Sequence, residues 1–208
     1  MLTGLKMKLA NKPMKRLSLY LFLILFALQN PSLADNINDL EIDGISIGDS
    51  LLDYYSVSEI KKQLSKTTSS YKSKRIKRIY FKAKENSIYG QYNFHYINDP
   101  SYRIVAVEGV MLYENNIDGC YEKQIEVTKD IENNFSNLSK KERTFNHRAD
   151  KTGKSKVKGV KFELENGVIR ISCTSWSKKI KDNKPWRDSL KVSIASNEHM
   201  AWLRNEAY

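Results

Sequence analysis

The residues best suited to covalent chemistry are a serine and the histidines, and their spacing decides whether they could act together. Ser50 follows residues 40–47, which alternate apolar and polar side chains as a strand does, and it precedes a short run that favours a helix. A serine hydroxyl becomes a good nucleophile only when a neighbouring base takes its proton. The three histidines are His95, His147 and His199.

The segment Gly48-Asp49-Ser50-Leu51 resembles the nucleophile block of the GDSL esterase and lipase family, in which the serine ends a strand and starts a helix. The resemblance implies a partner pair in an Asp-x-x-His arrangement near the C-terminus. The residues three before the histidines are Tyr92, Thr144 and Ser196, so this arrangement is missing. Capping of a helix by the Ser50 oxygen explains the segment more simply. An esterase that uses Ser50 stays as the alternative function.

Two further motifs fall short of cofactor sites. Residues 151–155, Lys-Thr-Gly-Lys-Ser, end like a phosphate-binding loop, but Arg148 stands where that loop requires its first glycine. The histidines are far apart in sequence, and no set of cysteines and histidines has the spacing of metal ligands. The sequence therefore predicts no metal and no other cofactor.

Residues 14–34 have the form of a secretory signal peptide. Lys15 and Arg16 precede a twelve-residue, largely apolar run at 17–28, and small residues lead to a cleavage site after Ala34. The run is shorter than the roughly 20 residues that cross a bilayer, so a retained membrane helix is the weaker interpretation. We expect a start at Met14, cleavage after Ala34, a periplasmic or secreted location, and no stable membrane insertion after cleavage.

Removal of residues 1–34 changes the charge balance. It takes away five of the 35 basic residues and no acidic ones, so the net charge falls from +11 to 30 − 24 = +6. A surplus of this size is compatible with an anionic partner and also with solubility alone. Export removes the usual nucleic-acid partner, and acidic residues dilute the basic segments, so we expect no binding to nucleic acid.

Residues 35–208 are long enough for one domain. The patterns predict two short helices between Ser50 and residue 65, a longer helix at 117–135 and a terminal helix at 198–205. They also predict a loop at 137–158, either a hairpin tip or a long connection from helix to strand. The expected strands are 76–83, 89–97, 102–113, 157–164, 168–176 and 188–196. We therefore predict an α+β fold, with an antiparallel sheet of about six strands, helices packed on one face, and two helix-βββ halves.

The two cysteines test this arrangement. Alternation along 168–176 places Cys173 on the same face as Ile169 and Ile171, which is the inward face. Cys120 lies on the inward stripe of the long helix. An even cysteine count in an exported protein favours a disulfide, which would fix this helix to the sheet, while two buried free thiols are the alternative.

The opposite face of the same strand is polar. We predict a binding surface there made of Arg170, Thr174, Trp176, Lys161 and Lys191. Such a surface could dock a protein or an anionic envelope polymer, whereas a merely solvated face is the alternative.

Residues 41–55, Glu-Ile-Asp-Gly-Ile-Ser-Ile-Gly-Asp-Ser-Leu-Leu-Asp-Tyr-Tyr, precede a cysteine on a helix and a cysteine-containing strand that ends in Trp176. This combination resembles an uncharacterised family of small exported bacterial proteins, which implies export and a shared domain but no catalytic residue. The order of elements is also similar to envelope modules related to the BamE lipoprotein and to β-lactamase inhibitor proteins, although the lipid-anchoring cysteine of BamE is missing. Because the sequence contains no activated nucleophile, metal-ligand set or nucleotide-binding loop, we predict an exported, soluble, non-enzymatic binding module of the bacterial cell envelope, and the second resemblance favours the binding role.

The signal peptide leads to a direct prediction. We expect that the exported protein begins at Asp35 and that a tag placed before this residue is lost, because a signal peptidase removes the preceding segment. Intact mass measurement of the exported protein checks this, and an exported product that retains the tag would contradict it.

Overall fold

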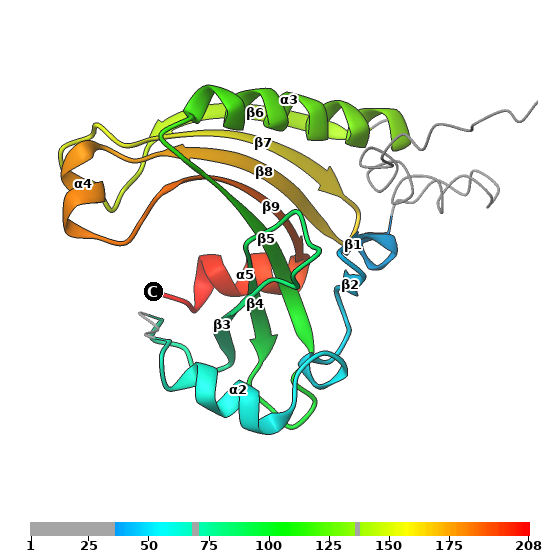
Figure 1. Cartoon of the computed structure of the whole chain (residues 1–208). Helices are drawn as coiled ribbons and strands as arrows, with labels where there is room; N and C mark the ends of the chain where they lie inside the picture. The colour runs from blue at the N-terminus through cyan, green and yellow to red at the C-terminus, as the bar shows by residue number, and fades with distance from the viewer. Residues whose placement is uncertain (1–35, 68–70, 136–137) are drawn as a thin grey trace, which may run out of the picture. The chain divides into compact units, whose positions relative to one another are not determined.

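This computed structural model describes residues 36–67, 71–135 and 138–208. In this part of the chain, seven strands form one antiparallel sheet (Figure 1). The strands are β3 (Ile76–Lys82), β4 (Gln91–Ile97), β5 (Ile104–Glu114), β6 (Ser139–Asn146), β7 (Lys156–Leu164), β8 (Gly167–Ser175) and β9 (Asp188–Ser196). Their order in the sheet is β3-β4-β5-β9-β8-β7-β6. The α+β fold is thus confirmed. The predicted signal peptide and its cleavage site lie outside the described residues.

The sheet consists of two meanders that meet where β5 pairs with β9. The first is β3-β4-β5 and the second is β7-β8-β9, as the expected helix-βββ arrangement requires, but β6 adds a seventh strand. The loop predicted at 137–158 is therefore wrong over 139–146. Every residue of β6 is exposed, so its side chains carry no apolar alternation that could signal a strand, and its structure comes from pairing with β7.

Helices cover both faces of the sheet, which corrects the expectation of one covered face. The long helix α3 (Ile117–Asn134) packs on β8, β9 and β5, and α2 (Val57–Leu64) packs on β3. The C-terminal helix α5 (Asn197–Asn205) lies on the opposite side of the strands from α3 (Figure 1). It buries Trp202 against Ile76 and Val105. α5 follows β9 without a connecting loop, so the chain passes directly from this strand to the helix.

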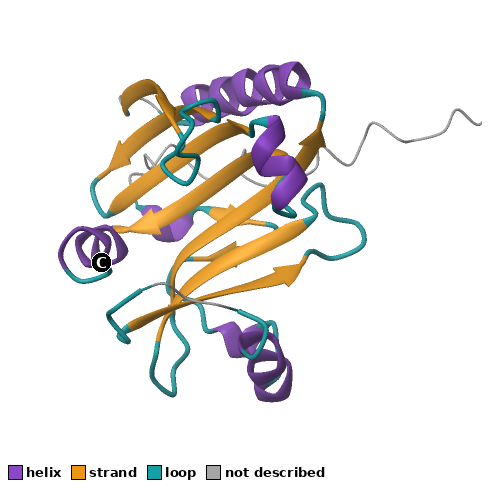
Figure 2. Ribbon diagram, turned by 90° about the vertical axis from the view of Figure 1, so that its left-hand side faces the viewer, coloured by secondary structure: helices purple, strands orange, loops and turns teal. Residues whose placement is uncertain are grey.

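The N-terminal segments complete the side covered by α3. They are η1 (Ile37–Asp39), the two-residue strands β1 (Glu41–Ile42) and β2 (Ile45–Ser46), and η2 (Leu51–Asp53). Asp43 and Gly44 both have positive φ, which suits the tight turn between β1 and β2. Buried side chains of these segments pack with Phe94 and Val107 of the sheet. A short helix that was not predicted, α4 (Lys178–Asn183), connects β8 to β9 (Figure 2).

Alternation along β8 separates two faces, which we name by one residue each. Ile169, Ile171 and Cys173 lie on the Cys173 face, toward α3, whereas Arg170, Ser172 and Thr174 lie on the Arg170 face. A disulfide joins Cys120 of α3 to Cys173, with 6.0 Å between the Cα atoms, and confirms the predicted pairing. Gln124, one turn further along α3, donates hydrogen bonds from Nε2 to the carbonyl oxygens of Lys158 and Ile171.

The disulfide is expected to stabilise the fold substantially. It closes a loop between residues 53 positions apart, for which the chain-entropy relation gives about 4 kcal/mol as an upper figure. We expect the double variant Cys120→Ser and Cys173→Ser to unfold at a lower urea concentration than the oxidised protein. A midpoint that matches that of the oxidised protein would contradict this role.

Candidate functional site

The predicted binding residues lie on or directly beside the Arg170 face. Lys161 of β7 is the cross-strand partner of Arg170, and Lys191 of β9 is the partner of Ser172, two residues along β8. Thr174 is 4% exposed, so its side chain is a buried part of the face rather than a contact surface. Trp176 follows the end of β8, and its backbone N–H donates to Asp188 Oδ1 at 2.7 Å.

Two neighbouring cross-strand rows give this face its charge. One row crosses the sheet at Glu108, Ser193, Arg170, Lys161 and Lys141, and the next at Val110, Lys191, Ser172, Gly159 and Arg143. These rows and the adjacent Glu163 bring together five cations and two carboxylates, which leaves a surplus of three positive charges. The sequence pattern predicts three of these cations but not Lys141 and Arg143, because it predicts a loop where the strand that carries them lies.

Arg170 differs from the lysines around it in having no ion pair with a described residue. Lys161 Nζ lies 2.7 Å from Glu163 Oε1, and Lys191 Nζ lies 3.2 Å from Glu108 Oε1. The Arg170 guanidinium instead donates from Nη2 to Met200 Sδ at 3.2 Å. Burial lowers the pKa of Arg170 from its usual value, and Glu108 opposes this shift from beyond ion-pair distance. A carboxylate or phosphate would therefore find donors on Arg170 that no acidic side chain already occupies.

A cluster of aromatic rings lies at the end of this face. The ring centroid of Trp176 is 4.7 Å from that of Trp186 and 4.3 Å from that of His147. Trp186 is 38% exposed. His147 follows β6, so the β6-β7 connection brings this ring to the end of β8. Burial, Lys191 and Arg148 together lower the pKa of His147.

The segment that resembled a phosphate-binding loop is already occupied by a carboxylate of the chain itself. Asp150 accepts hydrogen bonds from the backbone N–H groups of Thr152 and Ser155 at 2.9 and 3.0 Å, and from the Ser155 hydroxyl at 2.7 Å. These bonds hold the pKa of Asp150 far below its usual range. The carboxylate fixes the connection between β6 and β7 and takes the amide donors that a phosphate would need.

The structure also brings together two histidines that are 104 positions apart (199 − 95) in sequence. The rings of His95 on β4 and His199 on α5 have centroids 4.4 Å apart. His199 is buried, and neither of its ring nitrogens has a hydrogen-bond partner among the described residues. The Tyr71 hydroxyl lies 3.2 Å from His95 Nε2. Only the packing of α5 across the Arg170 face could reveal this pair, since nothing in the local sequence links the two residues.

Ser50, the alternative catalytic residue, has a structural role at the start of η2. Its hydroxyl donates to the carbonyl oxygen of Ser101 at 2.6 Å and accepts from the Leu52 N–H at 3.2 Å. Asp53 completes the capping box by accepting from the Ser50 N–H at 3.0 Å. In the described part of the molecule, the hydroxyl has no hydrogen bond to a histidine, so nothing positions a base to activate it.

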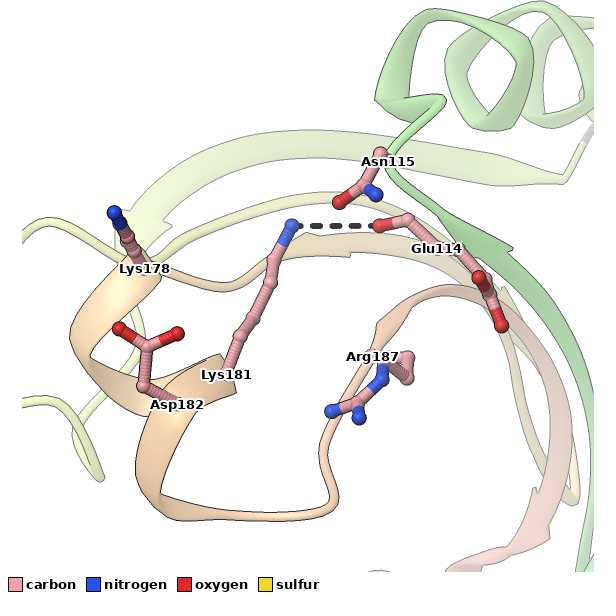
Figure 3. A pocket seen from close by; sticks show the side chains of 6 residues that line it. All are labelled: Glu114, Asn115, Lys178, Lys181, Asp182 and Arg187. Atoms are coloured by element: carbon pink, nitrogen blue, oxygen red, sulfur yellow. Dashed lines mark hydrogen bonds between the residues drawn. The ribbon is translucent and has the colours of Figure 1, made fainter.

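A pocket of about 470 Å³ lies between the end of β5 and α4 (Figure 3). Its lining residues are Glu114, Asn115, Lys178, Lys181, Asp182 and Arg187. Lys181 is already engaged, because its Nζ lies 2.7 Å from Asp188 Oδ2 and donates to the Glu114 carbonyl oxygen at 3.3 Å. The lining mixes cations and carboxylates and has no exposed apolar ring, so the Arg170 face is the stronger candidate site.

No protein-family model, curated protein or solved structure matches this chain. Within residues 36–67, 71–135 and 138–208, no helix is long and apolar enough to cross a membrane, and no three side chains of the metal-binding types stand close enough to hold an ion. The interpretation of the site therefore depends on its geometry and charge.

The buried histidine pair predicts a loss of stability in acid. Burial and the nearby Arg170 lower the pKa of His199 to about 4, from about 6.5 in an unfolded chain. As the pH is lowered below the unfolded-state pKa, the unfolded chain binds a proton while the folded protein does not. The free energy of unfolding therefore decreases as the pH decreases, and it levels off only below the folded-state pKa. Between pH 7 and pH 5 we expect His199 to remove about 2 kcal/mol, as measured by urea denaturation.

The variant His199→Phe is the control, because it keeps a buried ring of similar size and cannot bind a proton. Carboxylates that titrate over the same range are common to both proteins, so the difference between the two pH profiles reports His199 together with its effect on His95, whose pKa burial and the neighbouring His199 both lower. Parallel profiles would show that His199 does not carry the effect.

Proposed function

We propose that this protein is an exported, non-enzymatic binding module of the bacterial cell envelope that recognises an anionic partner on the Arg170 face. The single observation that carries the proposal is the pair of polar rows that cross the sheet there, with a surplus of cations and an arginine that makes no ion pair with a described carboxylate. The disulfide supports the export predicted from the N-terminus, because such bonds persist in oxidising compartments.

The form of the face suits binding better than catalysis. α5 packs over one end of the face, against Ala106, Val168 and Ala195, while the rows that hold Arg170 and Lys191 are only partly buried. Beyond these rows stand the rings of Trp176 and Trp186. An array of guanidinium and ammonium groups beside aromatic rings attracts an extended anion by charge and offers stacking contacts at its end.

Arg170→Gln tests this function. We expect the substitution to weaken binding of poly-L-glutamate at least fivefold, because it removes a cation in the middle of the face that makes no ion pair with a described carboxylate. Binding is measured by isothermal titration calorimetry at low and moderate salt. Lys62→Gln on α2 removes the same charge from an exposed site away from this face and is the matched control.

We expect the control to bind like the unaltered protein and the affinity of both to fall as salt is added. If Arg170→Gln and Lys62→Gln weakened binding equally, only net charge would matter, and the Arg170 face would not be the site.

A further inference from the structure

Strand β6 is an open edge of the sheet. It pairs with β7 on one side, and no described strand pairs with its other side. All of its residues, Ser139 to Asn146, are exposed. The opposite edge strand, β3, contacts α2, and its Tyr80 hydroxyl donates a hydrogen bond to the Lys66 carbonyl oxygen.

The hydrogen-bonding pattern shows which backbone groups of β6 point outward. The His147 N–H donates to the Ser155 carbonyl oxygen at 2.8 Å, so this pair is of the hydrogen-bonded type. Along an antiparallel ladder, such pairs alternate with non-hydrogen-bonded ones. Residues 141, 143 and 145 therefore direct their backbone groups toward β7, while Lys140, Glu142 and Thr144 direct theirs toward solvent. These three alternate residues present unpaired backbone N–H and C=O groups to which another strand could bond.

The side chains of β6 show what kind of strand fits. On the Arg170 face, Lys141 and Arg143 end the two polar rows; Lys141 Nζ lies 3.0 Å from Glu163 Oε1, whereas Arg143 makes no ion pair with a described residue. An added strand would place alternate side chains directly opposite these two cations, where carboxylates would be stabilised.

The other side of β6 leads to a groove under α3. This groove, of about 160 Å³, is lined by residues that include Lys140, Glu142, Ile125 and Thr128. Ile125 is 49% exposed. Gln124 Oε1 and Thr128 Oγ1 are buried in it without a hydrogen-bond partner among the described residues. Side chains with both a methyl and a hydroxyl group, such as threonine, suit this mixture of apolar and polar surface.

A second copy of this chain is a poorer occupant. In a symmetric antiparallel pair, facing residues share one side of the sheet, so the twofold axis passes midway between the two copies of one residue. The registers that pair most of β6 place the axis at Glu142 or at Arg143, and each sets like charges opposite one another. Such repulsion opposes self-pairing and leaves an acidic strand as the complementary partner.

We propose that the anionic partner is a protein whose extended, acidic, β-prone segment adds to β6 as an eighth strand. Its acidic side chains face Lys141 and Arg143, and its alternate side chains face the α3 groove. This inference rests on the function proposed above and names the partner of the same face. Main-chain hydrogen bonds to Lys140, Glu142 and Thr144 supply affinity, and the two cations select the acidic sequence.

A pair of fluorescein-labelled peptides tests strand addition. The alternating peptide is Thr-Glu-Thr-Glu-Thr-Glu-Thr, and the block peptide, Glu-Glu-Glu-Thr-Thr-Thr-Thr, has the same composition without alternation. By fluorescence anisotropy, we expect the alternating peptide to bind at least tenfold more tightly. Thr144→Pro removes an outward N–H without removing a bond to β7, so it should cancel this preference. Thr144→Val retains the N–H and the branched shape, and should preserve it.

Hydrogen exchange in the unaltered protein gives a second readout that does not depend on the proline variant folding. On binding the alternating peptide, the amides of Lys140, Glu142 and Thr144 should exchange at least tenfold more slowly. Those of Lys141 and Arg143 are already bonded to β7 and should change little. Unchanged exchange at the three outward amides would overturn strand addition.

The outcomes separate this inference from the function on which it rests. Equal binding of both peptides, with a loss on Arg170→Gln, would exclude strand addition and retain an anion-binding face. No binding of either peptide or of poly-L-glutamate would exclude both. A dimer of the unliganded protein that Thr144→Pro dissociates would make a second copy the occupant and overturn the acidic partner.

Discussion

The alternation of side chains along β8, fixed by one disulfide, determines which side chains of the sheet face α3 and which lie on the Arg170 face. Cys173 points toward α3 and is bonded there to Cys120, so the apolar residues on its side of the strand must face the same helix. The intervening residues, including Arg170, must then face the other way. A shift of β8 by one residue would bury the arginine under α3 and break the covalent link, so the register is doubly specified.

This separation of the two faces gathers the cations of the sheet on the Arg170 face. The Cys173 face is filled by α3, α2 and the N-terminal segments, while in the described part of the chain the opposite face is covered at one end by α5, together with Tyr71 and Ala207. The cations of four strands therefore share a single surface that continues to the open edge at β6. Surface and edge are parts of one site in our interpretation, because the rows that contain Arg170 and Lys191 end at Lys141 and Arg143.

Particular residues show which features of the fold and of the candidate site could be predicted from the sequence. Periodicity was sufficient for β3 to β5, α3 and β7 to β9, and it also placed Cys120 and Cys173 on surfaces that face each other. It failed for β6, whose exposed charged residues carry no alternation and whose strand depends on pairing with a distant partner. It also failed for His95 and His199, which meet only because α5 crosses to the Arg170 face. Three of the predicted binding residues are cations of one surface, whereas Thr174 is buried within it.

The central claim is that the Arg170 face, continued by β6, is where an anionic partner binds. Titration of the isotope-labelled protein with poly-L-glutamate, followed by amide chemical shifts in NMR spectra, tests it most directly. We expect the largest shifts at Arg170, Lys161 and Lys191 and along β6, with little change in α2. Shifts that gathered on α2 or around the α4 pocket, or that were spread evenly over all exposed lysines, would contradict the claim.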